Sequence, residues 1–414
     1  MPEKVLEKNV PSPGLHDPCP TGEKRFRRVP LTGNDAGAEA LKDANPDVAA
    51  VFPITPQTEL MHKFASFVHE GVVDTELVLV ESEHSAQSAC FGAAAAGART
   101  VTATSSQGLL LMAEICAITA ATRLPVIMPV VNRAISAPVN IGCDHSDSMF
   151  LRDSGWIQLY CEDSQEVYDT VLQAFKIGEH KDVLLPVMVC LDGFIISHTM
   201  EGLEVIGPDA ARRFVGEYDP AFTLLDTARP ITVGPLHLTE SYFECKRQVV
   251  EAMTNARRVI VEVGRAYGQL TGREYGLMEG YRLDDAEVAI VALGSTCGTA
   301  KVAADRARDK GVRAGVLKLR AFRPFPGEEI AAALGHVGTV AVLDRSISYG
   351  LAGGPLFHEI RSFMNHGDRL LSYVYGLGGR DITPTDLEGV FGELGEIARS
   401  GPSANVFRYI GLRE

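Results

Sequence analysis

The chain of 414 residues lacks both long hydrophobic runs and an excess of positive charge. The apolar stretch Leu109–Ala121 is interrupted by Glu114, so it falls short of the roughly 20 apolar residues that span a bilayer. The N-terminal segment contains no apolar core of signal-peptide length. The formal net charge of −14 argues against nucleic acid or an anionic membrane as a partner. We therefore expect a cytoplasmic protein that binds neither nucleic acid nor a membrane.

The cysteines form no Cys-x-x-Cys pair. The eight residues are Cys19, Cys90, Cys116, Cys143, Cys161, Cys190, Cys245 and Cys297. Zinc and iron–sulfur sites favour ligands that are close in sequence, because such ligands lose less chain entropy on binding. The spacing therefore predicts no metal site in this chain, and buried reduced thiols are the simpler interpretation.

A complete dinucleotide-binding fingerprint is also missing. The segment Gly294–Gly298 lies between a predicted strand and a predicted helix, but it lacks the third glycine. The next predicted strand ends in Lys318 and Arg320, where an acidic ribose ligand is expected. We interpret this segment, and likewise Gly376–Gly379, as a structural turn.

The composition is that of a globular protein, and the length predicts two domains. Hydrophobic residues make up 46% and charged residues 22%, and the length exceeds that of one ordinary core. Residues 1–28 are rich in Pro, Lys and Arg and lack periodicity, so we predict an N-terminal arm that wraps a neighbour or is disordered. The predicted domains cover residues 29–270 and 271–414, and the second is the smaller.

Apolar segments alternate with helical patterns in both predicted domains. This alternation is typical of a parallel sheet with helices on both faces. The predicted strands are 48–52, 77–80, 100–103, 124–131 and 184–190 in the first domain, and 288–293, 314–319, 339–343 and 371–375 in the second. One predicted helix begins at residue 35, and another directly follows Glu83. Further predicted helices cover 59–69, 165–176, 299–310 and 355–364.

Two polar segments follow neighbouring predicted strands. Glu81 and Glu83 come directly after the apolar segment Leu77–Val80 and precede a helix of small residues that ends at Gly97. The turn Ser105–Gly108 follows the next predicted strand and opens another helix. In open α/β sheets, ligands bind at the carboxyl ends of the strands. The two segments are therefore predicted to face one crevice.

Three further segments are candidates for the same crevice. In Pro53–Pro56, two prolines fix the backbone around the hydroxyl of Thr55, which suits a small oxygen-rich ligand, although a rigid turn alone is the alternative. Arg133 ends an apolar strand and matches a carboxylate ligand, although a salt bridge to Asp or Glu is an equal alternative. The segment Cys143–Asp147 combines acid, imidazole and hydroxyl, and we favour a hydrogen-bonded loop over a metal site.

Together these segments resemble the alpha subunit of the multi-subunit pyruvate:ferredoxin oxidoreductases, or pyruvate synthases, of the 2-oxoacid:ferredoxin oxidoreductase family. The resemblance covers nearly all of residues 30–400. The matching segments are Phe52–Pro56, Val80–Ser85, Thr104–Gly108, Asn132–Ala134, Cys143–Asp147, Arg152–Trp156, Leu343–Arg345 and Gly376–Asp381. The resemblance implies a pyrimidine-binding domain of a thiamine diphosphate enzyme, followed by a smaller α/β domain similar to the C-terminal domain of transketolases.

The same resemblance assigns roles to individual residues. Glu83 corresponds to the catalytic glutamate that binds the aminopyrimidine ring of the cofactor, and Glu81 does not. Thr55 and Arg133 correspond to the residues that receive the 2-oxoacid, and Asn140 is a further candidate for the substrate pocket. The related oxalate oxidoreductases carry arginine where this chain has Thr55, which favours pyruvate as substrate. The cofactor loop of the family corresponds to Ser105, Ser106, Gln107 and Gly108.

The chain lacks the Gly-Asp-Gly motif with a distal Asn that binds metal and diphosphate in thiamine enzymes, and it lacks cluster-binding cysteines. The resemblance therefore implies a beta subunit that brings the diphosphate and Mg²⁺ site. Gamma- and delta-type subunits would bring [4Fe-4S] clusters, and the complex would be a dimer of hetero-oligomers. Its reaction would convert pyruvate, coenzyme A and oxidised ferredoxin reversibly into acetyl-CoA, carbon dioxide and reduced ferredoxin.

Two alternatives to this function stay open. The first is a sister enzyme that acts on branched-chain 2-oxoacids or on 2-oxoglutarate. The second is a non-catalytic scaffold subunit that retains the fold.

Overall fold

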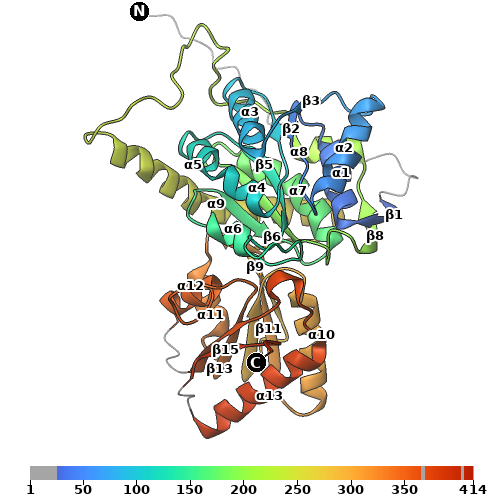
Figure 1. Ribbon diagram of the computed structural model, residues 1–414, viewed down its shortest axis with the longest axis vertical. Helices are drawn as coiled ribbons and strands as arrows, with labels where there is room; N and C mark the ends of the chain where they lie inside the picture. Colours follow the sequence, from blue (N-terminus) through green and yellow to red (C-terminus); the bar gives the residue numbers. More distant parts are fainter. Residues whose placement is uncertain (1–25, 365–368, 402–404, 414) are drawn as a thin grey trace, which may run out of the picture.

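The computed structural model describes residues 26–364, 369–401 and 405–413, which form two α/β units, one above the other in Figure 1. The upper unit is built on a sheet whose strands are all parallel except at one edge. Its order is β12 (Ala321–Arg323), β6 (Ile157–Tyr160), β7 (Val187–Asp192), β5 (Val126–Asn132), β4 (Thr100–Val101), β2 (Val48–Val51) and β3 (Glu76–Leu79). This arrangement confirms the predicted α/β class.

The lower unit has its own sheet, and a small ribbon flanks the upper one. The lower sheet is parallel apart from β9, which pairs antiparallel with β11. Its order is β15 (Phe407–Tyr409), β14 (Leu370–Val374), β13 (Thr339–Asp344), β10 (Val288–Ala292), β11 (Ala314–Leu319) and β9 (Met278–Tyr281). The ribbon pairs β1 (Arg27–Thr32) antiparallel with β8 (Met200–Val205).

Helices cover both faces of each sheet (Figure 1). The helices of the upper unit are α1 (Gly33–Ala44), α2 (Thr58–His69), α3 (Glu83–Ala95), α4 (Ser106–Leu111), α5 (Ala113–Ala121), α6 (Ser146–Phe150), α7 (Ser164–Gly178), α8 (Pro208–Val215) and α9 (Tyr242–Thr271). Those of the lower unit are α10 (Thr296–Asp309), α11 (Gly327–Leu334), α12 (Pro355–Phe363), a short 3₁₀ turn η2 (Leu377–Gly379) and α13 (Pro384–Ser400). No helix of the described ranges is both long and apolar enough to cross a membrane.

The apolar core is divided by the upper sheet into two clusters. On one face, side chains of α1, α2, α7 and α9 pack against the sheet. On the other face, the cluster under α3 and α5 continues into the lower unit, where it includes Leu293 and Val342. A third cluster lies between the lower sheet and the helices α10 and α13. The two units therefore share one continuous apolar layer.

Several elements differ from the sequence expectations. The strands β6 and β12 and the helices α8, α9, α11 and α13 were not predicted, although they lie among the described residues. The segment 321–323 falls within the predicted second domain, yet it pairs with β6 of the upper sheet. Of the predicted arm 1–28, residues 1–25 lie outside the described residues, whereas Arg27 and Arg28 begin β1. The domain boundary near residue 270 stays a prediction.

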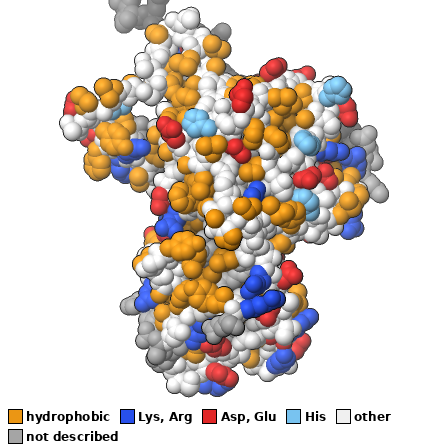
Figure 2. Space-filling model, in the orientation of Figure 1, with side chains coloured by type: hydrophobic (Ala, Val, Ile, Leu, Met, Phe, Trp, Pro, Cys, Tyr) orange, Lys and Arg blue, Asp and Glu red, His pale blue; other side chains and the backbone are white. Residues whose placement is uncertain are grey.

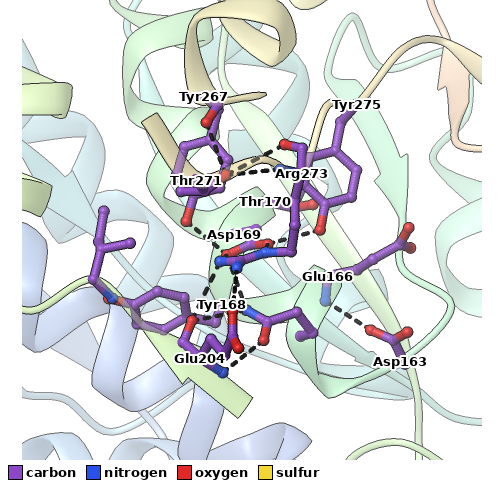
Figure 3. A network of polar contacts seen from close by, with 12 residues as sticks. Asp163, Glu166, Tyr168, Asp169, Thr170, Glu204, Tyr267, Thr271, Arg273 and Tyr275 are labelled. Carbon is purple, nitrogen blue, oxygen red and sulfur yellow. Dashed lines mark hydrogen bonds and ion pairs between the residues drawn. The ribbon is translucent and has the colours of Figure 1, made fainter. Parts of the chain in front are cut away.

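The long helix α9 is fixed at its C-terminal end by the buried Asp169 of α7 (Figure 3). Tyr267 at that end of α9 donates to Oδ1 of Asp169 at 2.6 Å. Arg273 and Tyr275, which follow α9, donate to Oδ2 at 2.7 Å each. One carboxylate therefore holds the segment that leads from the upper unit to the lower one.

A second buried polar cluster joins the two units directly. Asp192 at the end of β7 accepts a hydrogen bond from Arg345 Nη1 at 3.0 Å and lies 2.8 Å from His145 Nε2. The turn before α10 adds the backbone N–H and the hydroxyl of Ser295. Burial alone would raise the pKa of Asp192, but the Arg345 guanidinium and the His145 ring hold it well below its usual range. The segment Gly294–Gly298 is thus a structural turn that packs on Asp192.

We predict that Arg345→Met lowers the midpoint of thermal unfolding by more than about 5 °C. The substitution leaves the Asp192 carboxylate buried without its cation, and such a loss costs about 3–5 kcal/mol. Differential scanning calorimetry measures the midpoint. Arg313→Met is the matched control, because its exposed ion pair with Glu287 contributes little. Equal midpoints for both variants would contradict the prediction.

Candidate functional site

The candidate site residues lie in loops at the carboxyl ends of four adjacent strands, β3, β2, β4 and β5. The chain passes from β2 to β3 on one side and then returns to β4 on the other side of β2. Such a reversal leaves a crevice at the strand ends, where open α/β sheets bind ligands. Thr55 follows β2, Glu83 follows β3, Ser106 follows β4 and Arg133 follows β5. The observed strand order therefore places these four residues at one edge of the sheet.

Glu83 is the buried carboxylate of the pair predicted after β3. It is the first residue of α3, its N-cap Ser82 accepts a hydrogen bond from Ser85 N at 3.1 Å, and Glu83 is only 7% exposed. Glu81 is exposed. No described residue donates a hydrogen bond to the Glu83 carboxylate, although a buried acid normally has such a partner. The structure thus favours Glu83 over Glu81 as the residue that faces a ligand.

Gly108 lies directly against Glu83. A methyl group on its Cα would lie 2.7 Å from Glu83 Oε1 and 2.5 Å from Thr104 Oγ1. Any larger residue at position 108 would therefore overlap the side chains of Thr104 and Glu83. Sequence reasoning gave no role to Thr104, and only its position just before the Ser105 turn could have indicated one. The hydroxyls of Thr104 and Ser105 are fully buried and have no hydrogen-bond partner among the described residues.

The Arg133 guanidinium links the segments that contain Thr55 and Asn140. Its Nη1 donates to the backbone oxygen of Thr55 at 2.9 Å, and its Nε donates to that of Asn140 at 3.1 Å. No carboxylate of the described residues lies within ion-pairing distance, so the alternative of a salt bridge is not what the structure shows. The Thr55 hydroxyl has no partner among the described residues. A half-buried arginine without a counter-ion can accept a carboxylate ligand.

Asp147 connects the Ser105–Gly108 loop with the Arg133 loop. It accepts hydrogen bonds from Ser106 N at 2.9 Å and Arg133 N at 3.0 Å. Burial raises the pKa of this carboxyl to about 6, against the effect of its hydrogen bonds. Sequence reasoning placed Asp147 in a hydrogen-bonded loop without giving it a partner.

The remainder of the segment Cys143–Asp147 is held by hydrogen bonds rather than arranged for a cation. Cys143, His145 and Asp192 present ligand atoms within 4.8 Å of one another. However, Arg345 Nη1 contacts both Asp192 Oδ2 and Cys143 Sγ, the latter at 3.6 Å. The positive charge beside these two ligand atoms is therefore that of a guanidinium. Burial raises the pKa of the Cys143 thiol well above its usual value, which leaves it a poor ligand.

The residues of the crevice fit the aminopyrimidine part of thiamine diphosphate. A buried carboxylate without a partner can bind a ring nitrogen, and two buried hydroxyls without partners lie in the loop after β4. The described crevice offers no cluster of carboxylates free of cations that would hold the diphosphate through a metal.

Comparison with known proteins agrees with this geometry. Residues 39–265 match the family model described as "Pyruvate flavodoxin/ferredoxin oxidoreductase, thiamine diP-bdg", and residues 286–387 match "Pyruvate:ferredoxin oxidoreductase core domain II". Because the first match covers both Glu83 and Arg133, the crevice lies within the thiamine diphosphate-binding region of the family.

Curated relatives match over nearly their whole length. The chain is 50% identical to "Pyruvate synthase subunit PorA" of Thermotoga maritima, over 95% of this chain and 100% of the relative. It is 49% identical to the protein of the same name from Methanocaldococcus jannaschii, over 93% and 98%. It is also 42% identical to "Ketoisovalerate oxidoreductase subunit VorA" of Pyrococcus abyssi, over 91% and 96%.

Among solved structures, the fold resembles a 2-oxoglutarate:ferredoxin oxidoreductase from Magnetococcus marinus. The TM-score is 0.71 at 20% identity, and the match covers 90% of this chain but only 65% of the other. At this identity the likeness concerns the fold alone. The family-model matches and the relatives of 49–50% identity show that the chain belongs to the pyruvate:ferredoxin oxidoreductase family.

Proposed function

We propose that this chain is the alpha subunit of a cytoplasmic pyruvate synthase, in which it provides the substrate-binding half of the active site. The complex would convert pyruvate, coenzyme A and oxidised ferredoxin reversibly into acetyl-CoA, carbon dioxide and reduced ferredoxin. The observation that carries the proposal is the Arg133 guanidinium, which has no carboxylate partner among the described residues and lies in the same crevice as the unpaired Glu83. A 2-oxoacid supplies the missing anion.

Each residue of the crevice has one task in this proposal. Thiamine diphosphate, when bound, supplies the electron sink that decarboxylation of a 2-oxoacid requires. Glu83 binds the aminopyrimidine ring nitrogen and holds a proton there. Arg133 binds the substrate carboxylate and Thr55 places its hydroxyl near the reacting carbonyl, while Asn140 borders the same pocket through its contact with Arg133. Ser105, Ser106 and Gln107 form the loop that lies against the cofactor, and Gly108 leaves room for Glu83.

Partner subunits would complete the site. We propose a beta subunit that holds the diphosphate and Mg²⁺, and gamma- and delta-type subunits that carry [4Fe-4S] clusters to ferredoxin, in a dimer of hetero-oligomers. Exposed apolar side chains that flank Asn140 in the sequence, or that line a pocket with residues 135–137, support a covering partner. They are Val139 (80% exposed), Ile141 (51%), Phe150 (69%), Tyr349 (91%) and Leu351 (63%). Figure 2 shows hydrophobic side chains gathered where the two units meet.

Steady-state rates of the purified complex with pyruvate, 2-oxoisovalerate and 2-oxoglutarate test the substrate. We expect the highest kcat/KM with pyruvate. The relative named ketoisovalerate oxidoreductase makes branched-chain 2-oxoacids the second candidate. A higher kcat/KM with 2-oxoisovalerate or 2-oxoglutarate would replace pyruvate as the proposed substrate without changing the proposed site.

We predict that Arg133→Lys raises the KM for pyruvate about tenfold and changes kcat less. A lysine ammonium cannot reproduce the bidentate contact between guanidinium and carboxylate. Arg123→Lys is the matched control, because Arg123 also donates to backbone oxygens, those of Val183 and Leu184, but lies before β5 instead of after it. An unchanged KM for Arg133→Lys would remove Arg133 from the proposed site.

A further inference from the structure

A single buried carboxylate lies between the loop proposed to contact the cofactor and the loop proposed to bind the substrate. Asp147 belongs to the short helix α6 and is fully buried. Its Oδ2 accepts hydrogen bonds from the backbone N–H groups of Ser106 and Arg133, at 2.9 and 3.0 Å. Its Oδ1 accepts hydrogen bonds from Asn132 Nδ2 and Ser148 N, at 2.8 Å each. Both oxygens are thus saturated by donors from three segments.

The hydrogen bond to Asp147 stabilises an unusual backbone conformation of Ser106. Its φ of 47° lies in the left-handed region, which favours glycine and which serine rarely adopts. The Ser106 hydroxyl lies 2.5 Å from the backbone oxygen of Ala134, the residue after Arg133. The unusual conformation therefore turns the Ser106 N–H and hydroxyl toward the Arg133 loop, where Asp147 and Ala134 receive them.

We propose that Asp147 is a positioning residue that sets the spacing between the cofactor loop at Ser106 and the substrate guanidinium of Arg133. The proposal rests on the functions proposed above for these two residues. Asp147 need not touch either ligand, since its oxygens are occupied by the donors named above. Because one oxygen atom binds both backbone amides, a displacement of the carboxylate moves both loops.

The four N–H donors around Asp147 require a hydrogen-bond acceptor at both of its carboxylate oxygens. A carboxylate accepts at both of them, whereas an asparagine amide turns one of the two into a donor. In Asp147→Asn, two of the four N–H donors then face an NH₂ group, so the shared support of the loops is lost. The substitution keeps the size of the side chain and removes none of the groups proposed to touch the ligands.

The test is Asp147→Asn in the assembled complex, with two constants measured. We expect the KM for pyruvate and the thiamine diphosphate concentration for half-maximal activity to rise together, each about tenfold, while kcat at saturation falls less. Arg133→Lys should raise only the KM for pyruvate. A merely structural defect would reduce the active fraction, and hence the apparent kcat, without moving either constant.

Asp344→Asn is the matched control. Asp344 is also a buried carboxylate that accepts two backbone N–H groups, those of Leu356 and Phe357, but it lies in the lower unit. Both constants should stay unchanged in this variant. If Asp147→Asn does not assemble, Asn132→Ala removes a donor that orients the same carboxylate, and we expect about threefold shifts in both constants.

The outcomes separate this inference from the function on which it rests. If both constants are unchanged in Asp147→Asn, the positioning role is overturned; the same holds for Asn132→Ala where that variant is used. A raised KM for pyruvate in Arg133→Lys would still support the proposed site in that case. If Arg133→Lys leaves the KM for pyruvate unchanged, the proposed site itself fails. A shift of both constants in Asp344→Asn as well would also overturn the inference, because any buried acid would then have the same effect.

Discussion

Replacement of Glu83 by glutamine should reduce turnover with pyruvate by about 100-fold or more, while the complex still assembles. The amide has the size of the carboxylate but cannot exchange a proton with the aminopyrimidine ring. Loss of a positioned acid or base typically lowers the rate by about 100-fold or more. The crevice offers no substitute, because no other described residue contacts the Glu83 carboxylate through a hydrogen bond. Steady-state rates and size-exclusion chromatography provide the measurements.

Glu81→Gln is the matched control for this experiment. Glu81 precedes Glu83 by two residues and is exposed. The turnover of the Glu81→Gln variant should therefore equal that of the unchanged protein. Full activity of Glu83→Gln would instead support the scaffold alternative, in which the fold is retained and the chemistry lies elsewhere.

The Gly108→Ala variant should lose activity on a similar scale, although no polar group is removed. The new methyl group would lie 2.5 Å from Thr104 Oγ1 and 2.8 Å from Glu83 Cγ, which is closer than carbon atoms approach in proteins. The Glu83 side chain must therefore move, and a displacement of about 1 Å in a catalytic group can cost about 100-fold in rate. The measurement is kcat with pyruvate at saturating cofactor.

Gly92→Ala provides the comparison within the same helix as Glu83. Nothing lies within 4 Å of the methyl group there, and alanine favours the helical conformation. This variant should keep full turnover and a thermal midpoint that is equal or higher. Normal kcat in Gly108→Ala would show that Glu83 tolerates a shift, which contradicts the tight fit described here.

The sequence predicted the positions of the crevice residues because parallel strands end at one edge of a sheet. Thr55, Glu83 and Arg133 each follow an apolar segment, and such segments are recognisable from composition alone. The same reasoning missed β12, since three residues that pair with a distant strand carry no periodicity. The helix α9 was missed although it is 30 residues long, because much of its first half is exposed and polar.

Other properties of the site depend on contacts that no local pattern encodes. Asp147 acquires its role from the backbone N–H groups of two loops, and their direction follows from the φ of Ser106. Gly108 was assigned to the cofactor loop by resemblance, but its packing shows why a larger residue is excluded. Whether Arg133 has a counter-ion could be decided only once all acidic side chains were placed.

The pairing of β12 with β6 constrains how the protein is made on the ribosome. β6 lies between β7 and β12, so its outer edge has no partner until residues 321–323 have been synthesised. By then β10 and β11 have also been synthesised, and in the folded protein Phe322 packs edge-on against Tyr160 of β6. A nascent chain that stalls before this point exposes a strand edge to other chains, which is a known route to aggregation. Expression of the upper unit alone, cut after α9, would leave the same edge open.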